Sequence, residues 1–293
     1  MSLTSTLFIS FVVISVLLYY TAFTKIQWPM LLVISYLYYI SSGYKNVVFI
    51  LFTTVVTYTT AVIIEKLGKN ADKGVQWKKK LVLIAALILD FGVLATLKYT
   101  NFIIGNVNSI LHGNVSLINL ILPLGISFYT FQSTGYILDV YWKKADAEKN
   151  FFKLALFVSY FPQIMQGPIS RFNDLSSELF KKHSFSMHET EKACQLILYG
   201  MFKKMVLADN AAMFTNVIFD NYIKFNGMVI VGVLAYSIQL YADFSGGIDV
   251  VRGISKLFGI DIKDNFRQPY FAISITDFWH RWHITLGTWM KDY

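Results

Sequence analysis

The chain has 293 residues, of which 55% are hydrophobic, 17% aromatic and 15% charged, and its mean hydropathy is +0.49. Ordinary soluble domains carry more charge and fewer apolar residues, so this composition excludes that class and predicts an integral membrane protein. The net charge of +8 does not indicate nucleic-acid binding, because the lysines lie in loops between apolar runs, where retention on the cytoplasmic side explains them.

Apolar runs that approach or reach the length of a membrane span recur along the chain, since about 20 residues cross the hydrocarbon core. These runs cover residues 3–23, 28–42, 47–64, 81–97, 117–142, 151–165, 194–219 and 228–241. The first run lacks the basic start and small-residue cleavage pattern of a signal peptide, so we expect a retained span. The predicted fold class is an all-α, multi-spanning membrane helix bundle with re-entrant or interfacial helices, in one domain over residues 1–293.

Two stretches within this pattern predict local irregularities. The run 102–111 is too short to cross and contains Asn106 and Asn108, so we expect a re-entrant or interfacial piece there. Pro123 and Gly125 interrupt the run 117–142 near its start, and we expect them to kink the helix or to end a shorter preceding one.

Two lysine-rich segments set the expected orientation. One lies at 65–80 and the other at 143–153, and both should be cytoplasmic. Three expected crossings precede the first segment and two separate it from the second, so the two assignments agree. We therefore expect a multi-pass protein of the cell membrane with its N-terminus on the extracytoplasmic side.

The C-terminal third places polar residues close behind an apolar helix that begins near Met228. Asp243, Asp249 and Arg252 are examples, and such residues rarely face lipid. Gly246 and Gly247 favour a helix broken at this point, which would line a cavity. The alternative is that Asp243 and Asp249 cap a helix end at the interface.

A helix is expected to begin after Ser274 and to run toward Met290. Ser274 can accept a hydrogen bond from the amide of Asp277, whose carboxylate reaches back. Helical spacing places His283 on an apolar stripe of the helix. The stripe consists of Trp279, Trp282, His283, Leu286 and Met290. Burial on this stripe should keep the imidazole neutral at pH 7, with a lone pair able to act as general base.

Other interpretations of the two histidines stay open. His283 could be a core histidine bonded to a carbonyl group, or it could share a zinc ion with His280, although the sequence offers no obvious further ligands. His280 lies on a more polar flank and is the weaker catalytic candidate. The single cysteine, Cys194, excludes an intramolecular disulfide and is expected to pack between helices. No phosphate-binding loop motif occurs, so ATP hydrolysis is not expected.

Five sequence blocks together resemble a known family, the membrane-bound O-acyltransferases, and within it the alginate O-acetyltransferase-like branch. The blocks are residues 123–131, 161–168, 240–246, 265–270 and 278–293, the last reading Phe-Trp-His-Arg-Trp-His-Ile-Thr-Leu-Gly-Thr-Trp-Met-Lys-Asp-Tyr. The teichoic-acid D-alanyl transferases share the Trp-His core. Tyr270 and the run that follows His283 are more similar to the alginate-type branch.

The resemblance implies an enzyme that moves an acyl group, commonly acetyl, from a thioester donor to a hydroxyl of an exported cell-surface polysaccharide, as in alginate biosynthesis. The donor would be a substrate, acetyl-CoA or an acyl carrier protein, with no bound cofactor and no metal. His283 matches the family's essential histidine, while Asp243, Arg281 and Trp282 match motif positions that would support it. The expected partners are the lipid bilayer, the polysaccharide and a secreted or periplasmic acyltransferase, with no nucleic acid.

Family members continue through several more helices and carry a second functional histidine there, so the chain is expected to lack C-terminal helices. Two alternatives to acyl transfer remain. One is a transporter or flippase that binds substrate at a helix broken near Asp243, and the other is an inactive truncated remnant. The side chains of Lys203, Lys204 and Arg171 could meet phosphates of the donor, although their placement by the positive-inside rule is the stronger interpretation.

Overall fold

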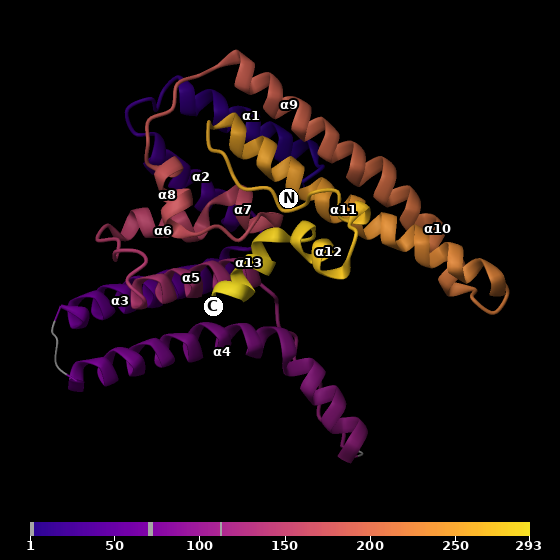
Figure 1. Ribbon diagram of the computed structural model, residues 1–293, viewed down its shortest axis with the longest axis horizontal. Coiled ribbons are helices and arrows are strands. Elements are labelled where there is room, and N and C mark those ends of the chain that lie inside the picture. The colour runs from indigo at the N-terminus through magenta and orange to yellow at the C-terminus, as the bar shows by residue number, and fades with distance from the viewer. Residues whose placement is uncertain (1–2, 70–72, 112) are drawn as a thin grey trace. The chain divides into compact units, whose positions relative to one another are not determined.

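The computed structural model describes residues 3–69, 73–111 and 113–293, and all regular secondary structure in that part of the chain is helical (Figure 1). The predicted all-α class is therefore confirmed. The chain divides into two compact units. The first unit contains the chain up to Gln27, Met165–Ser170 and Glu178–Asp292. The second contains Trp28–Ile164, Arg171–Ser177 and Tyr293.

Three helical stretches in the described residues are long and apolar enough to cross a membrane. They are Tyr44–Gly68, Val75–Leu111 and Asn226–Leu257. Large apolar side chains on these helices point outward, with Val48 67%, Ile88 66% and Ile230 71% exposed. Such surfaces are stable next to lipid and unfavourable next to water. The helix of the first apolar run, α1 (Thr6–Tyr20), is shorter, at 15 residues.

The second unit is built around α3 (Val47–Gly68), which packs against α4 (Lys73–Leu111), α5 (Ile126–Tyr141) and α6 (Phe151–Ser159). Its remaining elements are a 3-10 turn at Tyr44–Asn46, α2 (Gln27–Ser41) apart from its first residue, and parts of α7 (Phe161–Gln166) and α8 (Phe172–Leu179). Threonines on the buried face of α3 donate to carbonyl groups one turn earlier, which satisfies their hydroxyls without water. Examples are Thr54 to Ile50, at 2.7 Å, and Thr57 to Thr53, at 2.6 Å.

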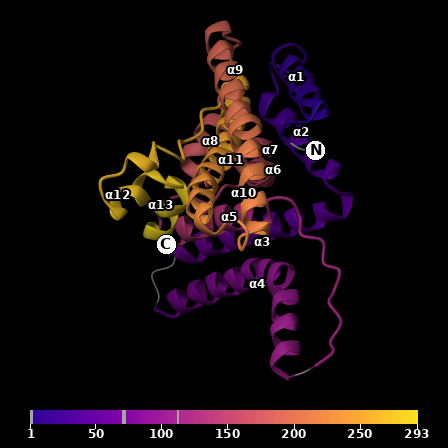
Figure 2. The same cartoon turned by 90° about the vertical axis from the view of Figure 1, so that its right-hand side faces the viewer.

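The run 102–111, for which we expect a re-entrant or interfacial piece, is the last part of α4 and not a helix of its own. Figures 1 and 2 show that α4 bends but does not stop. The two amides that suggested a break are satisfied locally. The side chain of Asn106 donates to the Phe102 carbonyl at 2.7 Å, and that of Asn108 pairs with the backbone of Val115. Polar side chains thus do not interrupt the helix here.

The prediction for Pro123 and Gly125 also needs correction, because α5 begins after both residues and 113–123 has no regular structure. Gly125 has a φ of 67°, in the left-handed region that glycine adopts easily. A Cβ atom at this position would collide with the carbonyl oxygen of Ile164. The two residues therefore start a helix where the backbone passes close to α7.

In the first unit, one long helical path comprises α9 (Met187–Met201), a π-helical segment (Phe202–Ala208) and α10 (Asp209–Asp220). After a 3-10 turn at Asn226–Met228, α11 (Val229–Leu257) returns along this path and packs against all three parts (Figures 1 and 2). Gly200 and Gly246 lie where the two helices approach most closely. A Cβ on Gly200 would lie 2.6 Å from the Gly246 oxygen, and one on Gly246 would lie 2.7 Å from the Gly200 oxygen.

The predicted break at Gly246 and Gly247 is wrong, because α11 is continuous from Val229 to Leu257. Gly246 instead allows the backbone of α9 to approach α11, because a Cβ there would lie 2.7 Å from the Gly200 oxygen. The alternative of an interfacial cap is also wrong, since Asp243 and Asp249 lie inside α11 and form ion pairs with Lys204 and Lys203. The expected packing role of Cys194 is likewise not supported, because its side chain is exposed.

Candidate active site

The histidine motif lies where one short helix ends and another begins. The first, α12 (Ile275–Arg281), starts as predicted, because Ser274 accepts from the Asp277 amide at 3.0 Å. The Asp277 carboxylate reaches back to the Ile273 amide at 3.1 Å. The second helix, α13 (Ile284–Asp292), starts directly after His283, whose φ is 45°. The predicted continuous helix to Met290 is therefore wrong.

The break has a physical cause in the connecting segment 258–274, which joins α11 to α12. At the break, the Ile284 amide donates to the Asn265 carbonyl at 3.0 Å, and the Arg267 amide donates to the Arg281 carbonyl at 3.0 Å. These bonds engage backbone groups that a continuous helix would use internally. A tertiary contact thus overrides the local helical pattern and places His283 between two helix ends.

His283 is partly buried between α11 and the connecting segment. Its ring meets the ring of Phe244 edge to face at 4.9 Å between centroids, and its Nδ1 lies 3.3 Å from Oδ1 of Asn265. The residue lies outside the three span-length helices. Burial lowers the pKa of His283 to about 4, so the imidazole is neutral at pH 7, as predicted. The burial comes from these neighbours rather than from a stripe on one helix.

Asn265 is a site residue that sequence reasoning missed. It is 1% exposed, and its Oδ1 accepts from both the amide of Thr285, at 2.9 Å, and its hydroxyl, at 2.8 Å. The Thr285 hydroxyl in turn accepts from the Ile169 amide at 3.1 Å. The only signal in the sequence was the membership of Asn265 in one of the resembling blocks, because its position 18 residues before His283 follows no helical period.

Trp282 belongs to an aromatic cluster beside the histidine. Its ring lies 5.0 Å from that of Phe266 and 5.5 Å from that of Phe278, between centroids, and Tyr241 and Tyr270 complete the cluster. Tyr270 also donates to the Ser237 carbonyl of α11 at 2.6 Å. Trp282 therefore helps to hold α12 and the connecting segment against α11.

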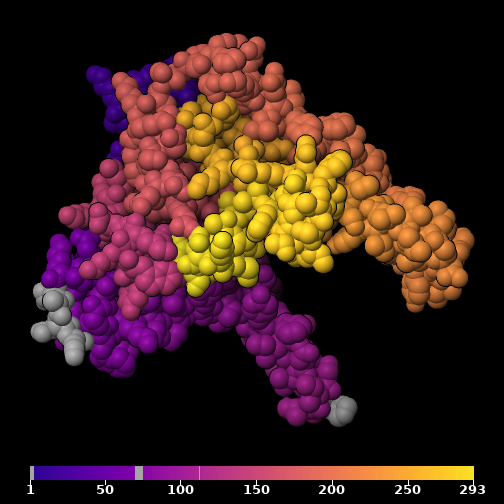
Figure 3. All heavy atoms as spheres, in the orientation of Figure 1, coloured from indigo at the N-terminus to yellow at the C-terminus, as the bar shows by residue number. Residues whose placement is uncertain are grey.

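The two other predicted supporting residues are engaged elsewhere. Arg281 donates to Asp277 at 2.9 Å within α12, which holds the pKa of that carboxyl below its usual range. Asp243 pairs with Lys204. His280 is exposed at the surface of α12, and Figure 3 shows α12 and α13, in yellow, on an open face. Among the described residues, no three side chains of His, Cys, Asp or Glu gather in a metal-binding group.

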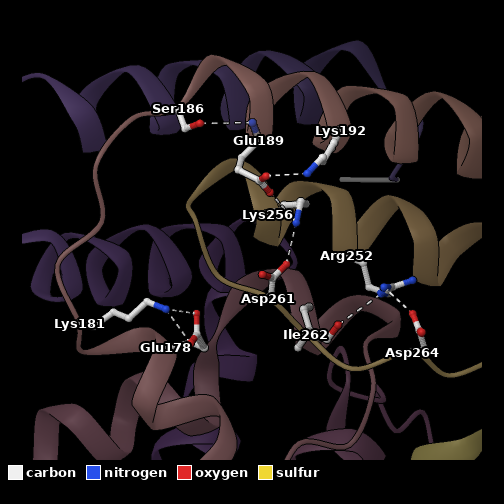
Figure 4. Close-up of polar contacts among 10 residues, drawn as sticks. All are labelled: Glu178, Lys181, Ser186, Glu189, Lys192, Arg252, Lys256, Asp261, Ile262 and Asp264. Carbon is white, nitrogen blue, oxygen red and sulfur yellow. Dashed lines mark hydrogen bonds and ion pairs between the residues drawn. The ribbon is translucent and has the colours of Figure 1, made fainter.

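A line of charged residues fixes the connecting segment to α11. Arg252 pairs with Asp264, the neighbour of Asn265, and its Nε donates to the Ile262 carbonyl at 3.3 Å. Lys256 contacts Asp261 at 3.0 Å and Glu189 of α9 at 2.8 Å (Figure 4). These contacts hold the stretch that leads into Asn265 at two points.

The basic residues considered for donor phosphates have other partners. Lys203 is 7% exposed, pairs with Asp249 and donates to the Ser245 hydroxyl at 3.1 Å. Lys204 pairs with Asp243. In the second unit, Arg171 lies over the ring of Tyr293 at 5.8 Å. The first two lysines are thus neutralised by carboxylates of α11.

Comparison with known proteins extends these observations. Residues 147–293 match the family model of the membrane-bound O-acyltransferases. The chain is 35% identical over 283 residues to a probable alginate O-acetylase of Pseudomonas aeruginosa, a match that covers 94% of this chain and 53% of that protein. It is 36% identical over 242 residues to a peptidoglycan O-acetyltransferase of Helicobacter pylori, covering 73% of this chain and 46% of that protein.

A more distant similarity links the chain to a teichoic acid D-alanyltransferase of Bacillus subtilis, at 30% identity over 184 residues, or 60% of this chain and 45% of that protein. The chain spans about half the length of the curated relatives it matches. Helical architecture, span-length apolar helices, the Trp-His motif and these similarities agree. The chain therefore belongs to the membrane-bound O-acyltransferase family and is alginate O-acetylase-like within it.

Proposed function

We propose that this chain carries the general base of a membrane O-acyltransferase that transfers an acyl group from a thioester to a hydroxyl of an exported polysaccharide. One observation carries the proposal: His283 is a partly buried, neutral imidazole at the junction of α12 and α13. The relatives support it, because their names describe acyl transfer to alginate, peptidoglycan or teichoic acid.

In the proposed reaction, an imidazole nitrogen of His283 takes the proton of the acceptor hydroxyl while the oxygen attacks the thioester carbonyl carbon. The C–S bond then breaks, and the imidazolium returns its proton to the departing thiolate. The products are an O-ester and a thiol, so atoms and protons balance. Because its pKa is about 4, the base form is present throughout the physiological pH range, although a base near pH 7 would provide more driving force.

The acyl group in this proposal is acetyl, since two of the three relatives described above are O-acetylases. D-alanyl transfer is the second candidate, supported by the more distant match. Acetyl-CoA or an acyl carrier protein would supply the thioester. A secreted or periplasmic acyltransferase would be a further partner, and the chain would act in the cell membrane.

The transport alternative depended on a helix broken near Asp243. Since α11 is continuous there, no observation now favours binding of a substrate at a helix break. Acyl transfer remains the function that the site supports best.

Replacement of His283 tests the proposal. In cells that make the polysaccharide, His283→Ala should lower its ester-linked acetyl content at least 100-fold, because positioned general bases contribute roughly 10²- to 10⁴-fold. Acetate released by mild alkali measures this content. His280→Ala is the matched control, since His280 lies in the same motif but is exposed, and it should retain acetylation. Full acetylation in His283→Ala, at equal protein level, would reject the assignment.

A further inference from the structure

The orientation of the Asn265 side chain is determined by its neighbours. A backbone N–H can only donate, and the amide of Thr285 lies 2.9 Å from one terminal atom of Asn265. That atom must be the oxygen, because the NH₂ group of an asparagine is also a donor. The Thr285 hydroxyl, which accepts from Ile169, has its own hydrogen available for the same oxygen at 2.8 Å. The amide is therefore not free to turn around.

This orientation determines the protonation of the neighbouring imidazole. Nδ1 of His283 faces Oδ1 of Asn265 at 3.3 Å, and an amide oxygen cannot donate. A hydrogen bond between the two atoms therefore requires a hydrogen on Nδ1. A neutral imidazole has one N–H group only, so Nε2 then keeps its lone pair.

We propose that Asn265 is a positioning residue that holds His283 as the Nδ1–H tautomer and so presents Nε2 as the nitrogen that accepts the proton of the substrate hydroxyl. The tautomer is independent of any substrate. The role of Nε2 as the proton acceptor rests on the proposed function. It assigns the general base to one of the two ring nitrogens of His283.

The backbone of the same residue supports this role. The Asn265 carbonyl accepts from the Ile284 amide at 3.0 Å, so Asn265 contacts the residues on both sides of the ring through its main chain and side chain. Its Nδ2 atom is buried with no hydrogen-bond partner among the described residues. The side-chain amide thus forms hydrogen bonds through its oxygen only, although leaving a buried N–H donor unpaired costs about 1–3 kcal/mol.

An amide also differs from a carboxylate in its effect on the base. A carboxylate at this position would favour the imidazolium and raise the pKa of His283, whereas an amide accepts the Nδ1 hydrogen without adding charge. Three charged groups on the surrounding elements are paired with opposite charges, namely Asp243 with Lys204, Asp264 with Arg252, and Arg281 with Asp277, while Arg267 on the connecting segment is exposed. Asparagine thus fixes the tautomer and leaves the imidazole neutral.

Nitrogen NMR of the full chain, labelled with ¹⁵N-histidine and held in lipid nanodiscs at pH 7.5, tests the proposal. The chain contains five histidines, and the His283 signals are those lost in His283→Gln. We expect Nδ1 at the shift of a protonated nitrogen and Nε2 at that of an unprotonated one. Asn265→Leu should shift the population toward the Nε2–H tautomer. Thr285→Val, which perturbs the same cluster but keeps the acceptor of Nδ1, should retain the Nδ1–H form.

A wild-type spectrum with the hydrogen on Nε2 would overturn the proposal even if Asn265→Leu does not fold. An unchanged tautomer in a folded Asn265→Leu would do the same. Asn265→Asp gives a second check, because it should keep the hydrogen on Nδ1 and raise the pH at which His283 titrates. No result here depends on acyl transfer, so the positioning role and the proposed function can fail separately.

Discussion

At the scale of single residues, the site contains an unusual backbone conformation. His283, which lies just after α12, has a φ of 45°, and Gln268, which lies in the connecting segment before α12, has a φ of 47°. Residues other than glycine adopt this left-handed region rarely, at a cost of about 1–3 kcal/mol. The hydrogen bonds of the connecting segment maintain this geometry, which places a titratable ring between two helix ends.

The lowered pKa of His283 predicts a pH-dependent stability. Between pH 6.5 and about 4, the unfolded chain binds a proton on this imidazole and the folded chain does not, so stability falls as the pH decreases through this window. Above pH 6.5 the contribution is fully present. Allowing for partial exposure, we expect a loss of about 2 kcal/mol between pH 7 and pH 4.5. Thermal unfolding in detergent at a series of pH values measures it.

His283→Gln is the reference for this prediction, because glutamine has no proton to gain in the same range. The melting temperature of the variant should depend less on pH than that of the wild type. Equal pH dependence of the two proteins would show that His283 is not buried as a neutral group.

The site could be predicted from sequence only in part. The residue types around His283 indicated it as the candidate base, and Ser274 with Asp277 predicted the start of α12. The break at His283 and the role of Asn265 could not be found, because both depend on hydrogen bonds between residues about 14–20 positions apart. Local periodicity describes which face a residue occupies, but not which distant backbone group will replace a helical bond.

At the scale of elements, the close contact of α9 with α11 depends on glycine at position 200, which has no side chain. Gly200→Ala would bring a Cβ within 2.6 Å of the Gly246 oxygen and 2.8 Å of the Val250 nitrogen. Both are backbone atoms and cannot move aside without moving α11. We expect a destabilisation of about 2 kcal/mol, measured as a lower melting temperature in detergent.

Gly92→Ala in α4 is the matched control, because a Cβ there has no atom within 4 Å. Its expected effect is neutral or stabilising, by up to about 1 kcal/mol of helix propensity. A comparable loss in both variants would mean that glycine is needed for reasons other than close packing.

A second prediction concerns the buried cation of the π-helical segment. Lys203→Met should destabilise the protein by about 2–4 kcal/mol, because it removes the partner of Asp249 inside the helix pair. The residual contact of Asp249 with Arg252, at 3.6 Å, limits the loss. Lys204→Met should cost under about 1 kcal/mol, since Asp243 is 47% exposed. Similar melting temperatures for the two variants would contradict this difference.

The helices themselves were largely predictable, whereas their continuity was not. Apolar runs located the helices, because burial or contact with lipid requires apolar surface whatever the neighbours are. Asn106, Gly246 and Gly247 suggested interruptions that do not occur. Their effect depends on whether an amide finds a local acceptor and whether a second backbone is close, and the sequence of one segment does not contain that information.

At the scale of the whole molecule, the lysine-rich segments predict the orientation of the chain. Helices α1, α2 and α3 precede the first segment, and α4 and α5 lie between the two. If each of these five helices crosses the membrane, both lysine-rich segments lie on the same side of it. The positive-inside rule assigns that side to the cytoplasm. An epitope tag before Met1 should then be accessible to antibody in intact cells.

Cysteine labelling supplies the complementary measurement. In a Cys194→Ser background, Lys69→Cys places an exposed thiol in the first lysine-rich segment, since the Lys69 side chain is 70% exposed. A membrane-impermeant maleimide should react with it only after permeabilisation. A tag that needs permeabilisation, together with a cysteine that does not, would reverse the orientation.

The π-helical segment has a consequence for the register of the longest helical path. Lys203 and Ala208 are both buried although they are five residues apart, a spacing that an α-helix would separate by about 140°. Two long helices usually stay in contact by supercoiling. Here one wide turn resets the phase, so α9 and α10 both face α11. Deletion of the exposed Met205 would therefore remove the extra residue of this turn and let the path continue as an α-helix with α10 in nearly the same phase. Thr215 should then keep Gln239, its acceptor at 2.7 Å.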